Sequence, residues 1–167
     1  MSVRIQAEPL TAEAFAPFGT VIEISGEPSF FINAGRCGRY HDLARPDVRD
    51  REGAIAISIG RSDAVTLPLA IGLLERHPLG SQAFIPTGNA RMLVVVATDA
   101  GGVPGPARAF LAKPGQGVQY HANVWHGVLA PLEGPADFLI VDRVGPGDNL
   151  EEHHLPEDRC LLVDADV

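Results

Sequence analysis

Residues 113–128 read Lys-Pro-Gly-Gln-Gly-Val-Gln-Tyr-His-Ala-Asn-Val-Trp-His-Gly-Val. A turn rich in glycine and proline comes before Tyr120 and His121, and a short apolar run then carries Trp125 and His126. Because side chains alternate faces along a strand, Trp125 and His126 point to opposite sides. This predicts a strand whose tryptophan packs in the core. His126 faces the other side, where it serves either packing or chemistry.

Short strand-like runs surround this stretch, and turns separate them in a chain with 18 glycines and 14 prolines. One short helix is expected to begin at Thr11, which can cap it. Residues 35–53 read as a long surface loop. Alternating or apolar runs predict strands at residues 20–25, 30–34, 54–59, 71–77, 82–86, 91–98, 107–112, 124–130 and 136–144. The βα alternation of a parallel sheet is absent, so the pattern predicts an all-β sandwich or barrel.

The composition is that of a single globular domain covering residues 1–167, with 46% hydrophobic and 20% charged residues. A formal net charge of −8 disfavours nucleic acid and anionic membrane as partners. The two cysteines are too few for a disulfide framework and indicate reduced thiols, with a single bridge as the alternative. The first residues lack the apolar segment of a secretion signal, so a cytoplasmic location is expected.

A polar group is expected on the segment from residue 73 to residue 86. Period-2 alternation places Glu75 and His77 on one face and Arg76 on the other. If the turn at residues 78–81 pairs His77 with Gln82 in a hairpin, all three polar side chains share a face, with Glu75 opposite Phe84. A buried glutamate needs a partner, which favours a functional site. The structural alternative is a solvated Glu75 and a His77 that caps the turn.

A second group comprises Lys113, Tyr120, His121 and His126. Histidine is the side chain most easily poised as an acid or base near neutral pH, and it is a common metal ligand. The alternative is that His126 is a satisfied core histidine and that Tyr120 and His121 form a loop edge. Asp142 and Arg143, at a strand end, are interpreted as a structural ion pair or as support for the site.

Two strings resemble the ureidoglycolate lyase family, which is also called ureidoglycolate hydrolase. They are Leu-Glu-Arg-His-Pro-Leu-Gly-Ser-Gln-Ala-Phe-Ile-Pro at residues 74–86 and the first fourteen residues of the stretch quoted above. Weaker matches lie at residues 10–22, 137–143 and 149–152. The resemblance therefore covers nearly the whole chain, in order.

The resemblance implies a cupin fold, an antiparallel double-sheet β-barrel, and a homodimer. It implies cleavage of (S)-ureidoglycolate to glyoxylate and urea in allantoin (purine) catabolism, and it raises a divalent metal ion held by His77 and His126. The sequence departs from the family at Gly127, where another histidine is expected. It also lacks the His-x-His pair of strongly metal-binding cupins. Both departures weaken a three-histidine metal site.

Ureidoglycolate is a carbinolamine that carries a carboxylate, so its cleavage needs a base, an acid and a group that holds the carboxylate. We expect His121, His126 and Glu75 to be the catalytic residues. Lys113 and then Arg76 are candidates for the carboxylate, and Gln82 and Tyr120 for the rest of the substrate. Two rival hypotheses are a non-catalytic cupin that binds a small carboxylate and a sister lyase acting on another ureido or 2-hydroxy acid.

Overall fold

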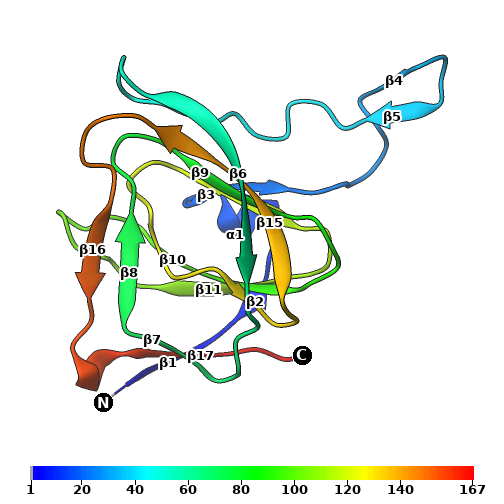
Figure 1. Ribbon diagram of the computed structural model, residues 1–167. Helices are drawn as coiled ribbons and strands as arrows, with labels where there is room; N and C mark the ends of the chain where they lie inside the picture. The colour runs from blue at the N-terminus through cyan, green and yellow to red at the C-terminus, as the bar shows by residue number, and fades with distance from the viewer. Residues whose placement is uncertain (1) are drawn as a thin grey trace.

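The computed structural model describes residues 2–167, and most of its regular structure is β-strand (Figure 1). The helical elements of these residues are one turn of α-helix, α1 (Ala12–Phe15), and a 3-10 turn, η1 (Glu157–Arg159). The hydroxyl oxygen of Thr11 accepts a hydrogen bond from Ala14 N at 3.2 Å, which confirms the predicted cap. None of the described helices has the length and apolar character needed to cross a membrane.

Two large sheets face each other and a small sheet covers one of them. The first large sheet runs in the order β3 (Gly19–Ile22), β12 (Gly117–Tyr120), β9 (Gln82–Pro86), β15 (Ala136–Val144) and β6 (Ala54–Ser62). The second runs β16 (Glu151–His154), β8 (Leu73–Arg76), β13 (Trp125–His126), β10 (Met92–Ala97), β11 (Arg108–Ala112) and β2 (Glu8–Pro9), with β14 (Ala130–Pro131) also paired to β10. The small sheet is β1 (Val3–Gln6), β17 (Leu161–Asp164) and β7 (Leu69–Ile71).

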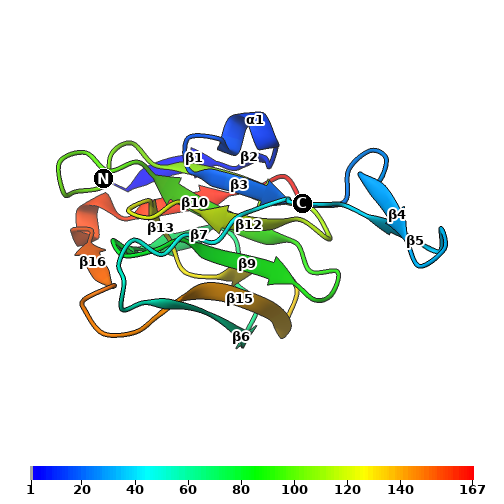
Figure 2. The same ribbon diagram turned by 90° about the horizontal axis from the view of Figure 1, so that it is seen from above.

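A separate hairpin, β4 (Phe30–Ile32) and β5 (Cys37–Arg39), projects from this body (Figures 1 and 2). The predicted all-β class is confirmed, and the two large sheets form the double-sheet arrangement of a cupin-like sandwich. Over residues 2–167 these sheets are not hydrogen-bonded into a closed barrel.

Strand β10 is an unbroken apolar run because both of its faces are buried. Its alternate residues enter two different cores, with Met92, Val94 and Val96 on one side. Leu93, Val95 and Ala97 lie on the other side, with Trp125 and the small sheet. A strand buried on both faces needs no polar side chains, which accounts for the unbroken apolar sequence. The first core, between the two large sheets, is rich in aromatic residues: Phe15, Phe18, Phe110, Phe138 and Tyr120.

The expected hairpin at residues 73–86 is not formed, and the prediction was wrong in its pairing. Strand β8 pairs with β13 and β16, whereas β9 pairs with β12 and β15. The intervening residues carry the chain from one large sheet to the other. Glu75 therefore stands opposite His126 in the register, and not opposite Phe84.

Several strand limits also differ from the prediction. The run at residues 71–77 is divided at Gly72, and the run at 124–130 is divided into β13 and β14. Strands β1, β2, β5, β12, β16 and β17 were not predicted. Strand β16 has the sequence Glu-Glu-His-His and lies at a sheet edge, where pairing by the backbone requires no apolar alternation.

Candidate active site

The candidate site lies between the two large sheets, beside Tyr120 of the aromatic core. Glu75 comes from the end of β8, and His77 follows that strand. His126 is opposite Glu75 on β13. From the facing sheet, Gln82 lies at the start of β9, paired with Tyr120 of β12 on one side and with Asp142 of β15 on the other. Five strands from two sheets therefore meet here.

Glu75 stands between two histidines. One of its carboxylate oxygens, Oε1, is 4.0 Å from His77 Nε2 and 3.9 Å from His126 Nδ1. About a third of its side chain is exposed, so solvent or a ligand can reach it. Desolvation raises the pKa of Glu75 above its usual range, opposed by His77 and aided by Glu152 of β16. A carboxyl group with a raised pKa is suited to exchange protons nearer to neutral pH.

His126 is held as a neutral imidazole. Its ring is buried and lies parallel to that of Tyr120, with centroids 4.4 Å apart. Burial is the main cause that lowers the pKa of His126 to about 3, and the neighbouring His77 contributes to the same shift. Nδ1 lies 3.1 Å from the carbonyl oxygen of Gly127, which can only accept, so Nδ1 carries the proton. Nε2 then holds a lone pair, and it is a buried nitrogen without a hydrogen-bond partner among residues 2–167.

His77 has acceptors on both sides of its ring. Nδ1 lies 2.7 Å from the main-chain oxygen of Asn149, and Nε2 lies 3.1 Å from Oε1 of Gln82. The amide of Gln82 is oriented by its other end, which donates to Asp142 Oδ2 at 3.0 Å. A doubly protonated ring satisfies both contacts, whereas a neutral ring satisfies only one. His77 and His126, with ring centroids 5.2 Å apart, therefore have opposite hydrogen-bonding environments.

Tyr120 completes the wall of the site. Its ring is buried against His126 and Phe84. Burial raises the pKa of the Tyr120 hydroxyl, and the charge of Glu75 adds to this effect. The side chain therefore remains a neutral phenol, which can donate one hydrogen bond.

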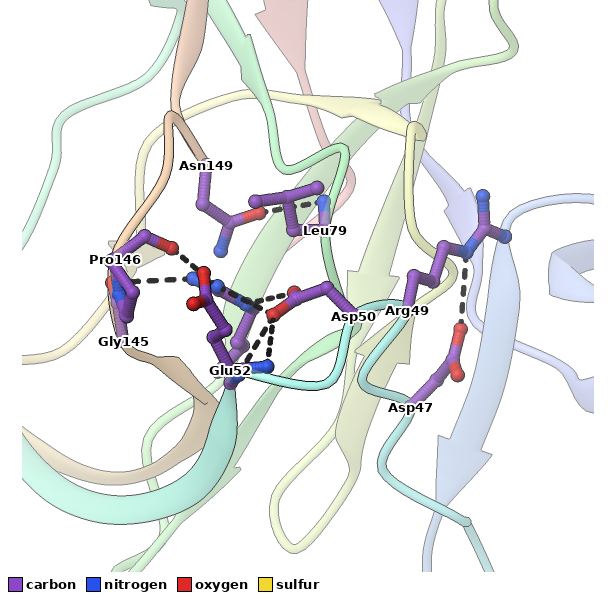
Figure 3. A network of polar contacts seen from close by, with 10 residues as sticks. Asp47, Arg49, Asp50, Glu52, Leu79, Gly145, Pro146 and Asn149 are labelled. Carbon is purple, nitrogen blue, oxygen red and sulfur yellow. Dashed lines mark hydrogen bonds and ion pairs between the residues drawn. The ribbon is translucent and has the colours of Figure 1, made fainter.

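A network behind the site fixes the segment that contacts His77 (Figure 3). The side-chain oxygen of Asn149 accepts a hydrogen bond from Leu79 N at 2.8 Å. Asn149 therefore contacts both His77 and Leu79 in the turn that follows β8. Nearby, the buried Arg143 guanidinium pairs with Asp50 at 2.6 Å and donates to the carbonyl oxygen of Gly145. The pair joins the loop before β6 to the segment that leads to Asn149. Arg143 therefore pairs with Asp50 and not with its neighbour Asp142, which contacts the site through Gln82.

Three residues expected at the site are not in this cluster. Arg76 points to the opposite face of β8, where it pairs with Asp99 at 2.7 Å and lies over the Trp125 ring. Lys113 is exposed and lines a separate cavity of about 330 Å³ with Leu10 and Gln116. His121 is exposed and lines another cavity, of about 400 Å³, beside Arg45 and Arg49. The cluster thus contains Glu75, His77, Gln82, Tyr120 and His126.

Asn149 and Glu152 were not singled out as individual site residues from the sequence. Both lie in the polar segment 149–152, whose resemblance to the family was the one available signal. Gly127 also has a different meaning in the structure. A Cβ atom there would lie 3.4 Å from Ile71 and Val95, on the Trp125 side of the sheet. A histidine at position 127 would point into the second core, away from Glu75.

The residues present fit a divalent metal ion. One ligand atom from each of Glu75, His77 and His126 lies within 4.8 Å of the others. Each histidine has its Nδ1 against a main-chain carbonyl oxygen, which is the usual outer partner of a metal-binding imidazole. The Gln82 amide oxygen faces His77 Nε2, so it would have to move before that nitrogen could bind an ion.

Comparison with known proteins decides the family. The sequence model of ureidoglycolate lyase matches residues 2–162. The chain belongs to the ureidoglycolate lyase family. It is 58% identical to the protein named ureidoglycolate lyase from Rhodobacter capsulatus, over 92% of this chain and 94% of that protein. It is 53% identical to the one from Chelativorans sp. strain BNC1, over 92% and 93% of the two chains. It is also 48% identical to the one from Pseudomonas entomophila, over 95% and 96%. These matches confirm the resemblance to the ureidoglycolate lyase family.

Proposed function

We propose that this protein is a lyase that converts (S)-ureidoglycolate to glyoxylate and urea, as a step of allantoin degradation. Membership of the ureidoglycolate lyase family supports the substrate. The observation that carries the chemistry is the position of Glu75, partly exposed between a neutral His126 and a His77 flanked by acceptors.

The reaction requires two proton transfers. The hydroxyl group of the substrate loses its proton, and its oxygen forms the new C=O bond of glyoxylate. The C–N bond breaks, its electrons pass to the ureido nitrogen, and that nitrogen takes up a proton to give urea. No oxidant is needed, and atoms and charge balance.

Glu75 is the base in this proposal, because its raised pKa suits proton abstraction and its side chain is accessible. His77, whose two neighbours accept hydrogen bonds, supplies the proton to the ureido nitrogen and its charge attracts the substrate carboxylate. Tyr120 and Gln82 are positioned to bond the hydroxyl or ureido groups. Proton transfer by a positioned group typically contributes about 10²–10⁴-fold in rate.

A divalent metal ion is a second proposal for the same cluster. Glu75, His77 and His126 would hold it, and it would supply Lewis-acid polarisation of the substrate hydroxyl. The two uses of His77 exclude each other, because a nitrogen that gives its lone pair to a metal carries no proton. Assays after dialysis against a chelator, and after adding back single divalent metals, distinguish them. Undiminished activity in chelator supports the acid–base use.

The direct test is the release of urea and glyoxylate from racemic ureidoglycolate by the purified protein, with the remaining enantiomer analysed by chiral chromatography. We expect stoichiometric products and consumption of the (S) form alone. No turnover by folded protein, with or without added metals, would overturn the proposal. Binding of glyoxylate without turnover would favour the non-catalytic, carboxylate-binding alternative. Turnover of only another ureido or 2-hydroxy acid would favour the sister lyase.

We also propose a homodimer and a cytoplasmic location. The free thiols of Cys37 and Cys160 support a reducing compartment. The net charge of −8 supports a small molecule, and neither nucleic acid nor a membrane, as the ligand.

A further inference from the structure

Asp142 of β15 is a partly buried carboxylate beside the site, and it has no cationic partner among residues 2–167. Its neighbour Arg143 lies on the other face of the strand and pairs with Asp50. Within the same residues, the one hydrogen bond to the Asp142 carboxylate comes from Nε2 of Gln82, at 3.0 Å. Burying a carboxylate costs free energy unless it is paired, so its position against a single uncharged amide needs a reason.

The five-stranded sheet fixes the position of this pair. Gln82 of β9 is in register with Asp142 of β15 on one side and with Tyr120 of β12 on the other. Directly opposed residues share a face, so the three side chains point to the same side of the sheet, toward the site. In the described chain, Asp142 makes no hydrogen bond or ion pair with His77. It can therefore act on that ring only through Gln82.

The Asp142 carboxylate decides which way the Gln82 amide faces. A carboxylate only accepts hydrogen bonds, so the NH2 end of the amide must face Asp142. The carbonyl oxygen of the amide, Oε1, then faces Nε2 of His77 at 3.1 Å. This oxygen also only accepts, so Nε2 carries a hydrogen and donates it. The reversed amide would place its oxygen against the carboxylate, where two negative groups repel each other.

The other side of the His77 ring offers no such choice. Nδ1 lies 2.7 Å from the main-chain oxygen of Asn149, which is an acceptor in every arrangement. A side-chain amide can present either end, so of these two neighbours Gln82 is the one that can change the role of the ring. With its NH2 group turned toward His77, Nε2 would accept a hydrogen bond, and a neutral ring would satisfy both neighbours. Asp142 excludes this second arrangement.

We propose that Asp142 is a positioning residue, which acts through the Gln82 amide to keep Nε2 of His77 as a hydrogen-bond donor. The proposal rests on the acid–base form of the proposed function, in which His77 supplies the proton that the ureido nitrogen takes up. Nε2 is the ring nitrogen nearest Glu75, 4.0 Å from its Oε1, so it is the one within reach of a substrate bound there. Two hydrogen bonds in series thus set the acid of the reaction from a strand that does not supply it.

The first test is Asp142→Asn, which keeps the size of the side chain and still allows a hydrogen bond to Gln82. Both amides can now reverse, and the reversed arrangement satisfies each partner without a charged ring, so the donor form of Nε2 should become the minor one. We expect kcat to fall about tenfold, the order of one charge-assisted hydrogen bond, with KM within about threefold of wild type.

Asp137→Asn is the matched control, because it is the same change on the same strand. Asp137 pairs with the exposed Arg61 at 2.7 Å, outside the site. Its kcat should stay within about twofold of wild type.

A second substitution should rescue the first. When Gln82→Glu is combined with Asp142→Asn, the carboxylate and the amide exchange places. The carboxylate now at position 82 can only accept, so it again faces Nε2 with an acceptor, and the amide at position 142 donates to its other oxygen. The kcat should return to within about threefold of wild type. Both variants keep a hydrogen bond between the two positions, so a role confined to packing predicts wild-type kcat in both.

The hydrogen on Nε2 can also be observed without turnover, by nuclear magnetic resonance of protein labelled at the histidine ring nitrogens. Wild type should show a slowly exchanging N–H signal from Nε2 of His77, identified by its absence from His77→Gln. Asp142→Asn should lose this signal, and the double variant should regain it.

Three results would overturn the proposal. They are a wild-type protein without the Nε2 signal, an Asp142→Asn chain that keeps either the signal or a kcat within about twofold of wild type, and a double variant no better than Asp142→Asn. Failure of the proposed function looks different. If wild type does not cleave ureidoglycolate while the signal follows the expected pattern, the lyase proposal fails and the orientation of His77 by Asp142 stands.

Discussion

The two ends of the space between the large sheets are built from similar strands but serve different purposes. At one end Phe15, Phe18, Phe110 and Phe138 pack together, with Phe15 and Phe110 edge to face at 5.6 Å. At the other end, Glu75 remains accessible between two histidines. The contrast shows that one end stabilises the fold while the other keeps titratable groups desolvated. Burial at the polar end shifts pKa values and so opposes stability.

Among substitutions at the two ends, Glu75→Gln is expected to have the largest effect, and that effect is on the reaction rate. Removing the base should lower kcat/KM by about 10²–10⁴-fold, with the fold unchanged. In wild type, kcat/KM should rise with pH through the raised pKa of Glu75, and the variant should lack this rise. Steady-state kinetics from pH 4 to pH 9 measure both.

The same substitution should also change how the free energy of unfolding depends on pH, which distinguishes loss of the base from loss of the fold. The folded protein favours protonated Glu75, so wild-type stability falls as pH rises from the unfolded pKa of 4.5 through the raised folded value. Glu75→Gln should therefore be more stable than wild type at pH 7, and the gain should vanish below pH 4.5. A variant that is less stable at pH 7 would show that Glu75 supports the fold.

At the apolar end, Phe110→Ala should lower the free energy of unfolding by about 3–5 kcal/mol, because it leaves a cavity in a closely packed core. Its kcat/KM per folded molecule should stay close to that of wild type. Urea unfolding and active-site assays well below the melting temperature provide the comparison. A rate loss as large as that of Glu75→Gln would mean that the two ends are coupled.

His126 provides a test by pH alone. Its pKa falls from 6.5 in the unfolded chain to about 3 in the fold, so the unfolded state binds more protons between these values. Stability should therefore rise from pH 3 to pH 6.5, with a contribution on the order of 5 kcal/mol. His126→Phe keeps a ring against Tyr120 and cannot be protonated, so its unfolding energy should depend less on pH. Identical pH dependences would contradict a desolvated His126.

Asn149→Ala should have a smaller effect, about 3–10-fold in kcat/KM, because the main-chain oxygen that contacts His77 remains while the bond to Leu79 is lost. The loss should appear mainly in kcat, since the variant disturbs the orientation of His77. Near-normal kcat with a raised KM would indicate a role in binding instead.

The smallest effect is expected for His121→Ala. His121 is exposed and lies outside the cluster, so kcat/KM should stay within about twofold of wild type. His126→Ala, measured alongside it, should lose at least about tenfold. A comparable loss in His121→Ala would place the reaction in the cavity beside Arg45 and Arg49.

Local patterns predicted a good part of this molecule. Thr11 indicated the helix start, and the apolar run at residues 91–98 indicated a strand buried on both faces. Alternation separated Trp125 from His126, and the same rule placed Arg76 away from Glu75. Where pairing had to be guessed, prediction failed. The proximity of His77 to Gln82 was right, but it arises across two sheets and not within a hairpin.

The sequence by itself determined the all-β class, the family, and the polar residue types available for chemistry, because these depend on periodicity and composition within short segments. Only the tertiary structure decided that Glu75, His77 and His126 meet while Lys113 and His121 stay apart. It also decided that His126 is neutral and that Asn149 holds His77. The physical reason is that burial and hydrogen-bond partners come from strands distant in sequence. The partners of β8 lie about 50 and 75 residues along the chain.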